Sequence, residues 1–169
     1  MEAKVSSKVG GKAIVTLPSK TEILIVREFN APKHLVYKAW TTPELVKRWW
    51  SAKRGTVTVA DIDLRVGGMW RWVMVTDEGG FEVAFHGVYK ELVPNERIVC
   101  TEAFEGIPDA DMNAALNILT LTEKNGRTTL TILVQHKTQE NRDAAINSGM
   151  EAGMQDAFDL LEEAIVEGQ

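Results

Sequence analysis

From Thr56 to Lys137 the sequence alternates between apolar and polar residues, and this pattern restricts the fold more than any other feature. Six alternating segments are separated by short turns: TVTVADIDL, GGMWRWVMVT, FEVAFHGVYKELV, RIVCTEAFE, NAALNILTLTEK and TTLTILVQHK. The pair Asn125 and Gly126 is a strong hairpin signal between the last two segments. Because turns this short join antiparallel neighbours, the sequence predicts an antiparallel sheet.

Further strand-like and helical segments flank this region. AIVT, which ends shortly before a proline, and TEILIVREF are both strand-like. PKHLVYKAW and PELVKRWW have apolar residues at helical spacing, and Thr42 with Pro43 is typical of a helix start, so we expect two short helices joined by a tight turn. Residues 139–168 form one long amphipathic helical segment. Gly149 and Gly153 interrupt it at about 1 kcal/mol each relative to alanine, which predicts the close approach of another backbone or of a ligand.

One antiparallel sheet must bury one of its faces, and the C-terminal helix is the large apolar partner that remains. We therefore predict an α+β fold. A curved antiparallel sheet of about six to seven strands wraps around a long C-terminal helix, and the two short helices after the first strand close one end. Gly67, Gly68 and Gly87 suit the bends or bulges that such curvature requires. A sheet curved this strongly does not close tightly on one helix, so we expect an apolar cavity between them.

Length and composition limit the classes of protein. A chain of 169 residues fits one domain, and we expect a flexible tail over residues 1–12 and a single domain over residues 13–169. Cys100 is the single cysteine, which excludes an intramolecular disulfide and favours a reducing compartment. The net charge of −5 argues against a nucleic-acid surface. No secretory signal and no membrane span can be recognised, so we expect a cytoplasmic protein.

The five tryptophans fall in two short stretches, WTTPELVKRWW and GGMWRWVM. They either fill the core or line the expected cavity, and both interpretations stay open from the sequence. Trp49 and Trp50 are about 100° apart around a helix, so one should face the core and the other the rim or a homodimer interface. The candidate ligand-binding residues are Trp40, Trp49, Trp70, Trp72, Phe85, Tyr89, Glu102, Phe104, Met150, Met154 and Phe158.

Glu102 is the charged residue among these candidates. It shares a strand face with Cys100 and Phe104, so its carboxyl needs a partner or a raised pKa. Arg71 can reach it only if the strands twist or bulge, because the alternation places Arg71 on the other face. Glu102 is thus a candidate polar anchor or general acid–base group. The alternative is a solvated carboxylate at a sheet edge, paired with a cation.

The sequence has no recognisable catalytic or cofactor motif. His34, His86 and His136 lack metal-binding spacing, and His86 should face solvent on the side opposite Phe85 and Tyr89. His136 lies near a strand end. It either reaches the mouth of the expected cavity or is a structural histidine with a hydrogen-bond partner. There is no nucleophile elbow, no zinc-protease motif and no phosphate-binding loop. We therefore expect no metal, no cofactor and no catalytic residue.

Four motifs in order resemble a known family. They are REFNAPKHLVYKAWTTPELVKRWW, DLRVGGMWRW, FHGVYKELVPNERIV, and TLTEKNGRTTLTILV followed by RDAAINSGMEAGMQDAFDLLEE. Over about residues 22–166 they are similar to the activator-of-heat-shock-protein-ATPase-like domains of the START-like (birch-pollen-allergen-like, SRPBCC) superfamily. The resemblance implies a helix-grip fold with a hydrophobic cavity. It also implies roles found in these groups, including co-chaperones, lipid carriers, hormone binders and some enzymes.

Two hypotheses for the function follow. In the first, the protein binds a small apolar molecule between the sheet and the C-terminal helix, in a pocket that is mostly apolar with a few polar groups. In the second, it is a co-chaperone-like module that interacts with a chaperone through its surface. A third hypothesis, an enzyme that uses the cavity for acid–base chemistry, has the least support.

Overall fold

The computed structural model describes residues 11–167 of the chain. Of the predicted tail, residues 1–10 lie outside the described residues. The elements in chain order are β1 (Ile14–Thr16), β2 (Glu22–Phe29), α1 (Lys33–Thr41), α2 (Pro43–Trp49), β3 (Gly55–Ile62), β4 (Met69–Thr76), β5 (Glu82–Val93), β6 (Arg97–Phe104), β7 (Ala115–Lys124), β8 (Arg127–Gln135), α3 (Gln139–Ile146) and α4 (Met150–Glu167).

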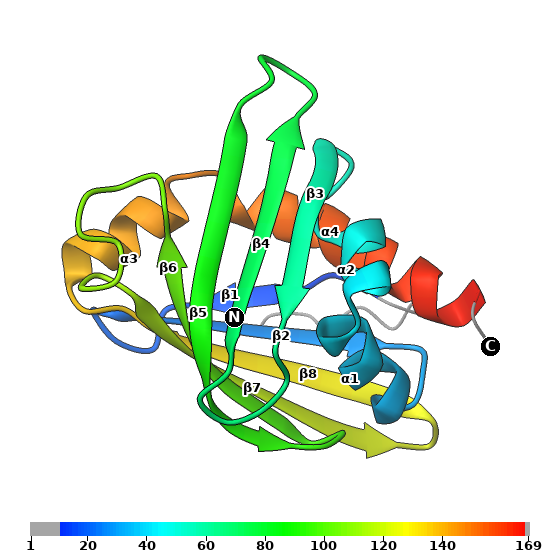
Figure 1. Cartoon of the computed structure of the whole chain (residues 1–169). Coiled ribbons are helices and arrows are strands. Elements are labelled where there is room, and N and C mark those ends of the chain that lie inside the picture. Colours follow the sequence, from blue (N-terminus) through cyan, green and yellow to red (C-terminus); the bar gives the residue numbers. More distant parts are fainter. Residues whose placement is uncertain (1–10, 168–169) are drawn as a thin grey trace.

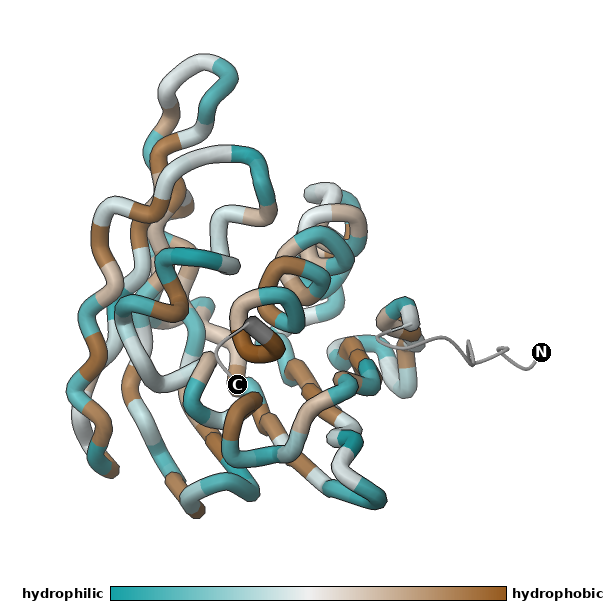
Figure 2. Tube along the Cα trace, turned by 90° about the vertical axis from the view of Figure 1, so that its right-hand side faces the viewer, coloured by the Kyte–Doolittle hydropathy of each residue, from teal (hydrophilic) through white to brown (hydrophobic). Residues whose placement is uncertain are grey.

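The eight strands form one antiparallel sheet in the order β1-β2-β8-β7-β6-β5-β4-β3 (Figure 1). After β2 the chain crosses through α1 and α2 to the far edge of the sheet. It then returns strand by strand until β8 pairs with β2. Figure 2 shows the sheet bent around α4, which lies on its concave side. This is the predicted helix-grip arrangement, and it is confirmed.

The strand count exceeds the predicted six to seven because the short segment Ile14–Thr16 also pairs, as edge strand β1, with β2. The other edge strand, β3, carries a register shift between Val57 and Val59 where it pairs with β4. The remaining strands follow the alternation of the sequence. In β2, for example, every second residue from Ile23 to Phe29 is buried.

The prediction of one continuous C-terminal helix is wrong. Thr138 caps α3, since its Oγ1 accepts a hydrogen bond from the Asn141 backbone N–H at 3.0 Å. The helix ends at Ile146, and Gly149 has a φ of +84°, a left-handed conformation that favours glycine and separates α3 from α4. Gly153 does lie within α4. A Cβ there would sit 3.5 Å from Arg54 Nη1, so a side chain rather than another backbone approaches it.

Arg27 is a buried charge in β2, whose sequence EILIVREF is otherwise mostly apolar. It is 2% exposed, on the concave side of β2. Its Nη2 lies 2.8 Å from Glu162 Oε1 and its Nη1 lies 3.4 Å from Asp159 Oδ1, both on α4. Its guanidinium also lies 4.7 Å from the centre of the Phe29 ring. Arg27 therefore fixes the position of α4 along β2.

Candidate functional site

The five tryptophans form one network of ring contacts with Trp72 near its centre. The ring centroid of Trp72 lies 5.1 Å from Trp70, 5.7 Å from Trp50, 5.9 Å from Trp49 and 6.2 Å from Trp40. Trp49 is 1% exposed and its indole N–H donates to the Ala39 carbonyl at 3.0 Å, whereas Trp50 is only partly buried. As expected from helix geometry, one of the adjacent pair faces the core and the other the rim.

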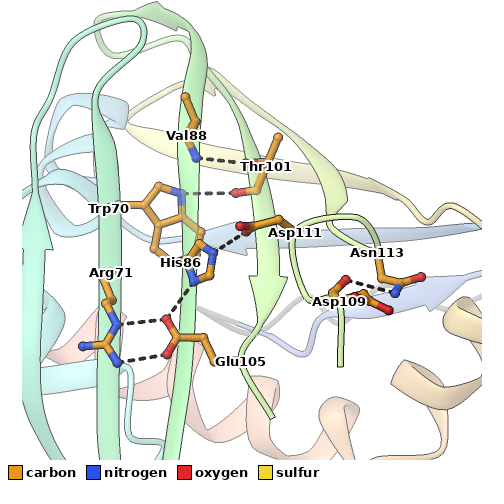
Figure 3. A network of polar contacts seen from close by, with 9 residues as sticks. All are labelled: Trp70, Arg71, His86, Val88, Thr101, Glu105, Asp109, Asp111 and Asn113. Carbon is orange, nitrogen blue, oxygen red and sulfur yellow. Dashed lines mark hydrogen bonds and ion pairs between the residues drawn. The ribbon is translucent and has the colours of Figure 1, made fainter. Parts of the chain in front are cut away.

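Trp70 is held by a contact that crosses a neighbouring strand. Its register partner on β5 is Gly87, and its indole N–H donates to the Thr101 carbonyl on β6 at 3.2 Å (Figure 3). A Cβ at Gly87 would lie 1.8 Å from that carbonyl oxygen and 2.6 Å from Trp70 Nε1. Gly87 is therefore required because the indole and the carbonyl meet directly above it.

The predicted ligand-binding residues divide by burial. Trp49, Trp70, Trp72, Tyr89 and Phe158 are buried. Trp40, Phe85, Glu102, Met150 and Met154 are partly buried, and Phe104 is 39% exposed. The ring of Phe85 contacts those of Phe104 and Trp50, at 5.1 and 5.9 Å between centroids. We call the partly exposed set, Trp50, Phe85, Glu102, Phe104, Met150 and Met154, the open end of the helix–sheet interface.

Glu102 lies on the concave face, as its alternation predicted. Its Oε1 accepts a hydrogen bond from Asn117 Nδ2 at 3.0 Å, and burial raises the pKa of its carboxyl. Arg71 is not its partner, because Arg71 lies on the opposite face and forms two 2.9 Å hydrogen bonds with Glu105. The alternative of an edge carboxylate paired with a cation is therefore wrong, and the described partner of Glu102 is a neutral amide.

Further polar groups surround Glu102 on the same face. Burial raises the pKa of the Cys100 thiol to about 12, and the nearby Glu102 carboxyl acts in the same direction. Burial also raises the pKa of Tyr89. The buried side-chain atoms without a hydrogen-bond partner in the described part of the chain include Trp40 Nε1, Trp72 Nε1, Asn117 Oδ1 and His136 Nε2. Each unpaired buried group costs free energy, so these atoms are polar groups that the packing of the described residues leaves unsatisfied.

A pocket of about 400 Å³ lies where β6, β7 and β8 meet the loop of residues 105–114. Its lining residues are Thr101, Asp111, Ala114, Ala115, Leu116, Gln135, His136 and Lys137. None of the predicted ligand-binding residues lines it, although Thr101 precedes Glu102 and Ala115 is the register partner of Glu102. The sequence analysis missed this pocket because the loop that forms part of its wall has no periodic pattern.

A polar network on the convex face connects β4, β5 and the same loop. His86 is on the predicted face, but its side chain is only 20% exposed. Its Nδ1 lies 2.7 Å from Glu105 Oε2 and its Nε2 lies 2.5 Å from Asp111 Oδ1 (Figure 3). Hydrogen bonds to these two carboxylates raise the pKa of His86, and Arg71 and His86 lower the pKa of Glu105 to about 2.

Two classes of site are not found among residues 11–167. No group of three or more His, Cys, Asp or Glu side chains is arranged to hold a metal ion. Within the same residues, no helix is both long and apolar enough to cross a membrane.

Comparison with known proteins places the chain in a family. The family model "Activator of Hsp90 ATPase homolog 1-like protein" matches residues 30–165, which include α1, the sheet from β3 to β8 and most of α4. The chain belongs to this family. A search of curated proteins finds no match to the chain.

Solved structures share the fold of this family member. A protein from Rhodobacter sphaeroides is 26% identical with a TM-score of 0.83, and the match covers 92% of this chain and 99% of that protein. A protein from Chromobacterium violaceum is 27% identical with a TM-score of 0.75, and the match covers 87% of this chain and 98% of that protein. A protein from Nitrosomonas europaea is 24% identical with a TM-score of 0.78, and the match covers 90% of this chain and 98% of that protein.

Proposed function

We propose that this protein binds a small apolar molecule at the open end of the helix–sheet interface. The observation that carries the proposal is the position of Glu102. Its carboxyl lies on the concave face, with the Asn117 amide as its partner, next to apolar side chains that the fold leaves partly exposed. Membership of a START-like family supports the same location for a ligand.

The side chains of the open end suit a ligand that is mostly apolar. Met150 and Met154 lie in the N-terminal part of α4, and both are only partly buried against the core. Methionine adapts to irregular shapes, and Phe85 and Phe104 add rigid apolar surface. A molecule seated here gains free energy by removing these surfaces from water.

The polar groups on this face would orient the molecule. A protonated Glu102 carboxyl can donate a hydrogen bond to a ligand carbonyl, while Asn117 Oδ1 can accept one from a hydroxyl or amide. A small apolar compound with one such group would therefore pair with atoms that lack a partner in the described part of the chain.

Native mass spectrometry of the freshly purified protein tests the proposal directly. It reports co-purified small molecules and, in the same spectrum, the number of subunits, which shows whether a homodimer forms. Titration with palmitate or with 1-anilinonaphthalene-8-sulfonate, followed by tryptophan emission and by melting temperature, provides the second measurement. A ligand at a hundredfold over its dissociation constant should add about 2.7 kcal/mol to the free energy of unfolding.

A matched pair of variants locates the binding. Met154→Trp fills the open end and should abolish the response, whereas Met69→Trp, at a side chain 57% exposed, should leave it unchanged. If no apolar compound gives a response in the unmodified protein, or if both variants bind equally well, the molecule does not bind at the open end.

Interaction with a chaperone is the second candidate. The family name refers to activation of a chaperone ATPase. The connection from β3 to β4 also exposes apolar side chains: Leu64 is 43% exposed, Val66 is 61% exposed, and Met69, the first residue of β4, is 57% exposed. Addition of the protein to a purified Hsp90-type chaperone should then stimulate ATP hydrolysis. Val66→Ser with Met69→Ser should reduce this stimulation, whereas Met154→Trp should not. An unchanged ATPase rate with the unmodified protein would exclude this candidate.

A further inference from the structure

The loop of residues 105–114 is fixed to the rest of the molecule at two places. Glu105 and Asp111 both contact His86 on β5 (Figure 3). Asn113 accepts a hydrogen bond from Asn141 Nδ2 on α3 at 3.1 Å. The loop therefore reaches from the convex face of the sheet to the helical layer. Because both attachments are side-chain hydrogen bonds, the wall that Asp111 and Ala114 contribute to the pocket is formed before any ligand arrives.

The polar atoms in this pocket are mainly donors without a partner. Thr101 Oγ1 accepts from the Val88 backbone N–H at 2.9 Å, which leaves its own O–H free to donate. The His136 side chain adds no donor to the pocket, because its Nε2 is fully buried on the concave face that it shares with Val134. Burial and the nearby Arg142 on α3 lower the pKa of this histidine. In the same residues, no carboxylate lies within 4.0 Å of the Lys137 ammonium.

The negative charge of the pocket is already balanced. Asp111 is the one acidic residue in the lining, and its Oδ1 is bonded to His86 Nε2 on the other side of the loop. Gln135 is also engaged, since its Nε2 donates to Glu22 Oε2 at 2.9 Å. What remains for a ligand is a cation and a hydroxyl donor, next to the apolar side chains of Ala114, Ala115 and Leu116.

We propose that this pocket is a second binding site, and that it takes a small carboxylic acid with a short apolar body. The carboxylate would accept hydrogen bonds from Lys137 and Thr101, and the apolar body would lie against Ala114, Ala115 and Leu116. The volume of about 400 Å³ is within the range of small-molecule sites. The site is distinct from the open end and does not depend on the function proposed there.

Benzoate is a suitable probe, since it combines one carboxylate with one small apolar ring. Its titration into the full ¹⁵N-labelled chain should shift the amide signals of residues 114–116 and 135–137 in a saturable manner, with a dissociation constant on the order of 1 mM. Benzamide, which has the same shape without the charge, should bind about tenfold more weakly.

Variants test the donors one at a time. Lys137→Gln and Thr101→Val should each weaken benzoate binding about fivefold or more. Lys137→Arg keeps the positive charge and should retain most of the affinity that Lys137→Gln loses. Lys124→Gln is the matched control, because Lys124 is an exposed lysine at the far end of β7 from Ala115. His86→Gln releases Asp111 and should also weaken binding, because the free carboxylate repels the ligand.

Three results would overturn the proposal: no saturable shift with benzoate, equal affinity for benzoate and benzamide, or shifts confined to Phe85, Phe104, Met150 and Met154. The last result would place the acid at the open end and would support the function proposed there.

Discussion

The two ends of the helix–sheet interface differ although one helix and one sheet form both. At the packed end, Phe29, Val36, Leu130 and Leu161 are completely buried, and Arg27 joins β2 to α4 by two ion pairs. At the open end, methionines and phenylalanines stay partly exposed, and the Glu102 carboxyl is bonded by a neutral amide. The difference indicates that one end of α4 contributes more to stability than the other, and the binding site proposed above lies at the less packed end.

The largest expected contrast is between two arginines that bind α4. Arg27→Ala leaves Asp159 and Glu162 without their buried cation, so the free energy of unfolding should fall by about 3–5 kcal/mol. Arg54→Ala removes a pair with Asp156 in which both side chains are about half exposed, and should cost less than about 1 kcal/mol. Urea unfolding followed by tryptophan emission measures both. Equal losses would mean that the two ends are equally important for stability.

Truncation of apolar side chains on α4 should give the second contrast. Leu161→Ala creates a cavity at a fully buried position and should cost about 3 kcal/mol. Met154→Ala removes a side chain that water already reaches, and should cost about 1 kcal/mol. The same urea experiment applies. A loss at Met154 as large as that at Leu161 would show that the open end is closed in solution.

Glu102→Gln should stabilise the protein at neutral pH. Because burial raises the pKa of Glu102, the folded state binds this proton more tightly than the unfolded state does. The stability contributed is complete below the ordinary value near 4.5 and is lost as the pH rises through the folded pKa. The variant avoids that loss and keeps an oxygen for Asn117. The melting temperature of Glu102→Gln should therefore exceed that of the unmodified protein at about pH 7, and the two should converge at about pH 4. Glu78→Gln, in an exposed turn, is the control, and an equal effect there would contradict the burial of Glu102.

The smallest expected effect is at His86, outside the interface. Its raised pKa means that its stabilising contribution is present below about 6.5 and is lost as the pH rises through the folded value. His86→Gln should therefore lower the melting temperature at about pH 5.5 by more than at about pH 9. The exposed His34→Gln serves as the control. A pH-independent loss would indicate that His86 acts through packing and not through its charge.

The fold could be predicted because its signals are local. Alternation and the Asn125–Gly126 turn determine neighbouring strands, and helical spacing already separates Trp49 from Trp50. The face occupied by Glu102 follows from the same alternation. Arg27 could not be placed, because its partners lie 132 and 135 positions away on α4. The break at Gly149 depends on a backbone conformation, and a glycine alone does not distinguish a helix end from a tolerated interior residue.

The candidate site was predicted less well than the fold. The residues of the open end were chosen for size and polarity, and the structure brings Phe85, Phe104 and Trp50 into contact. The pocket beside residues 105–114 and the contacts of His86 arise from a loop whose path no periodicity describes. Sequence reasoning therefore identified the elements of the concave face but not the groups that the connecting loop adds.

The register shift in β3 has a consequence for the molecule in a crowded cell. An open sheet exposes unpaired backbone N–H and C=O groups along its outer strands, where a strand from another copy can add. The irregularity between Val57 and Val59 twists this edge away from the flat geometry that such addition needs, and the opposite edge, β1, has only three residues. The protein can thus keep a sheet open enough to grip its helix without becoming a template for aggregation.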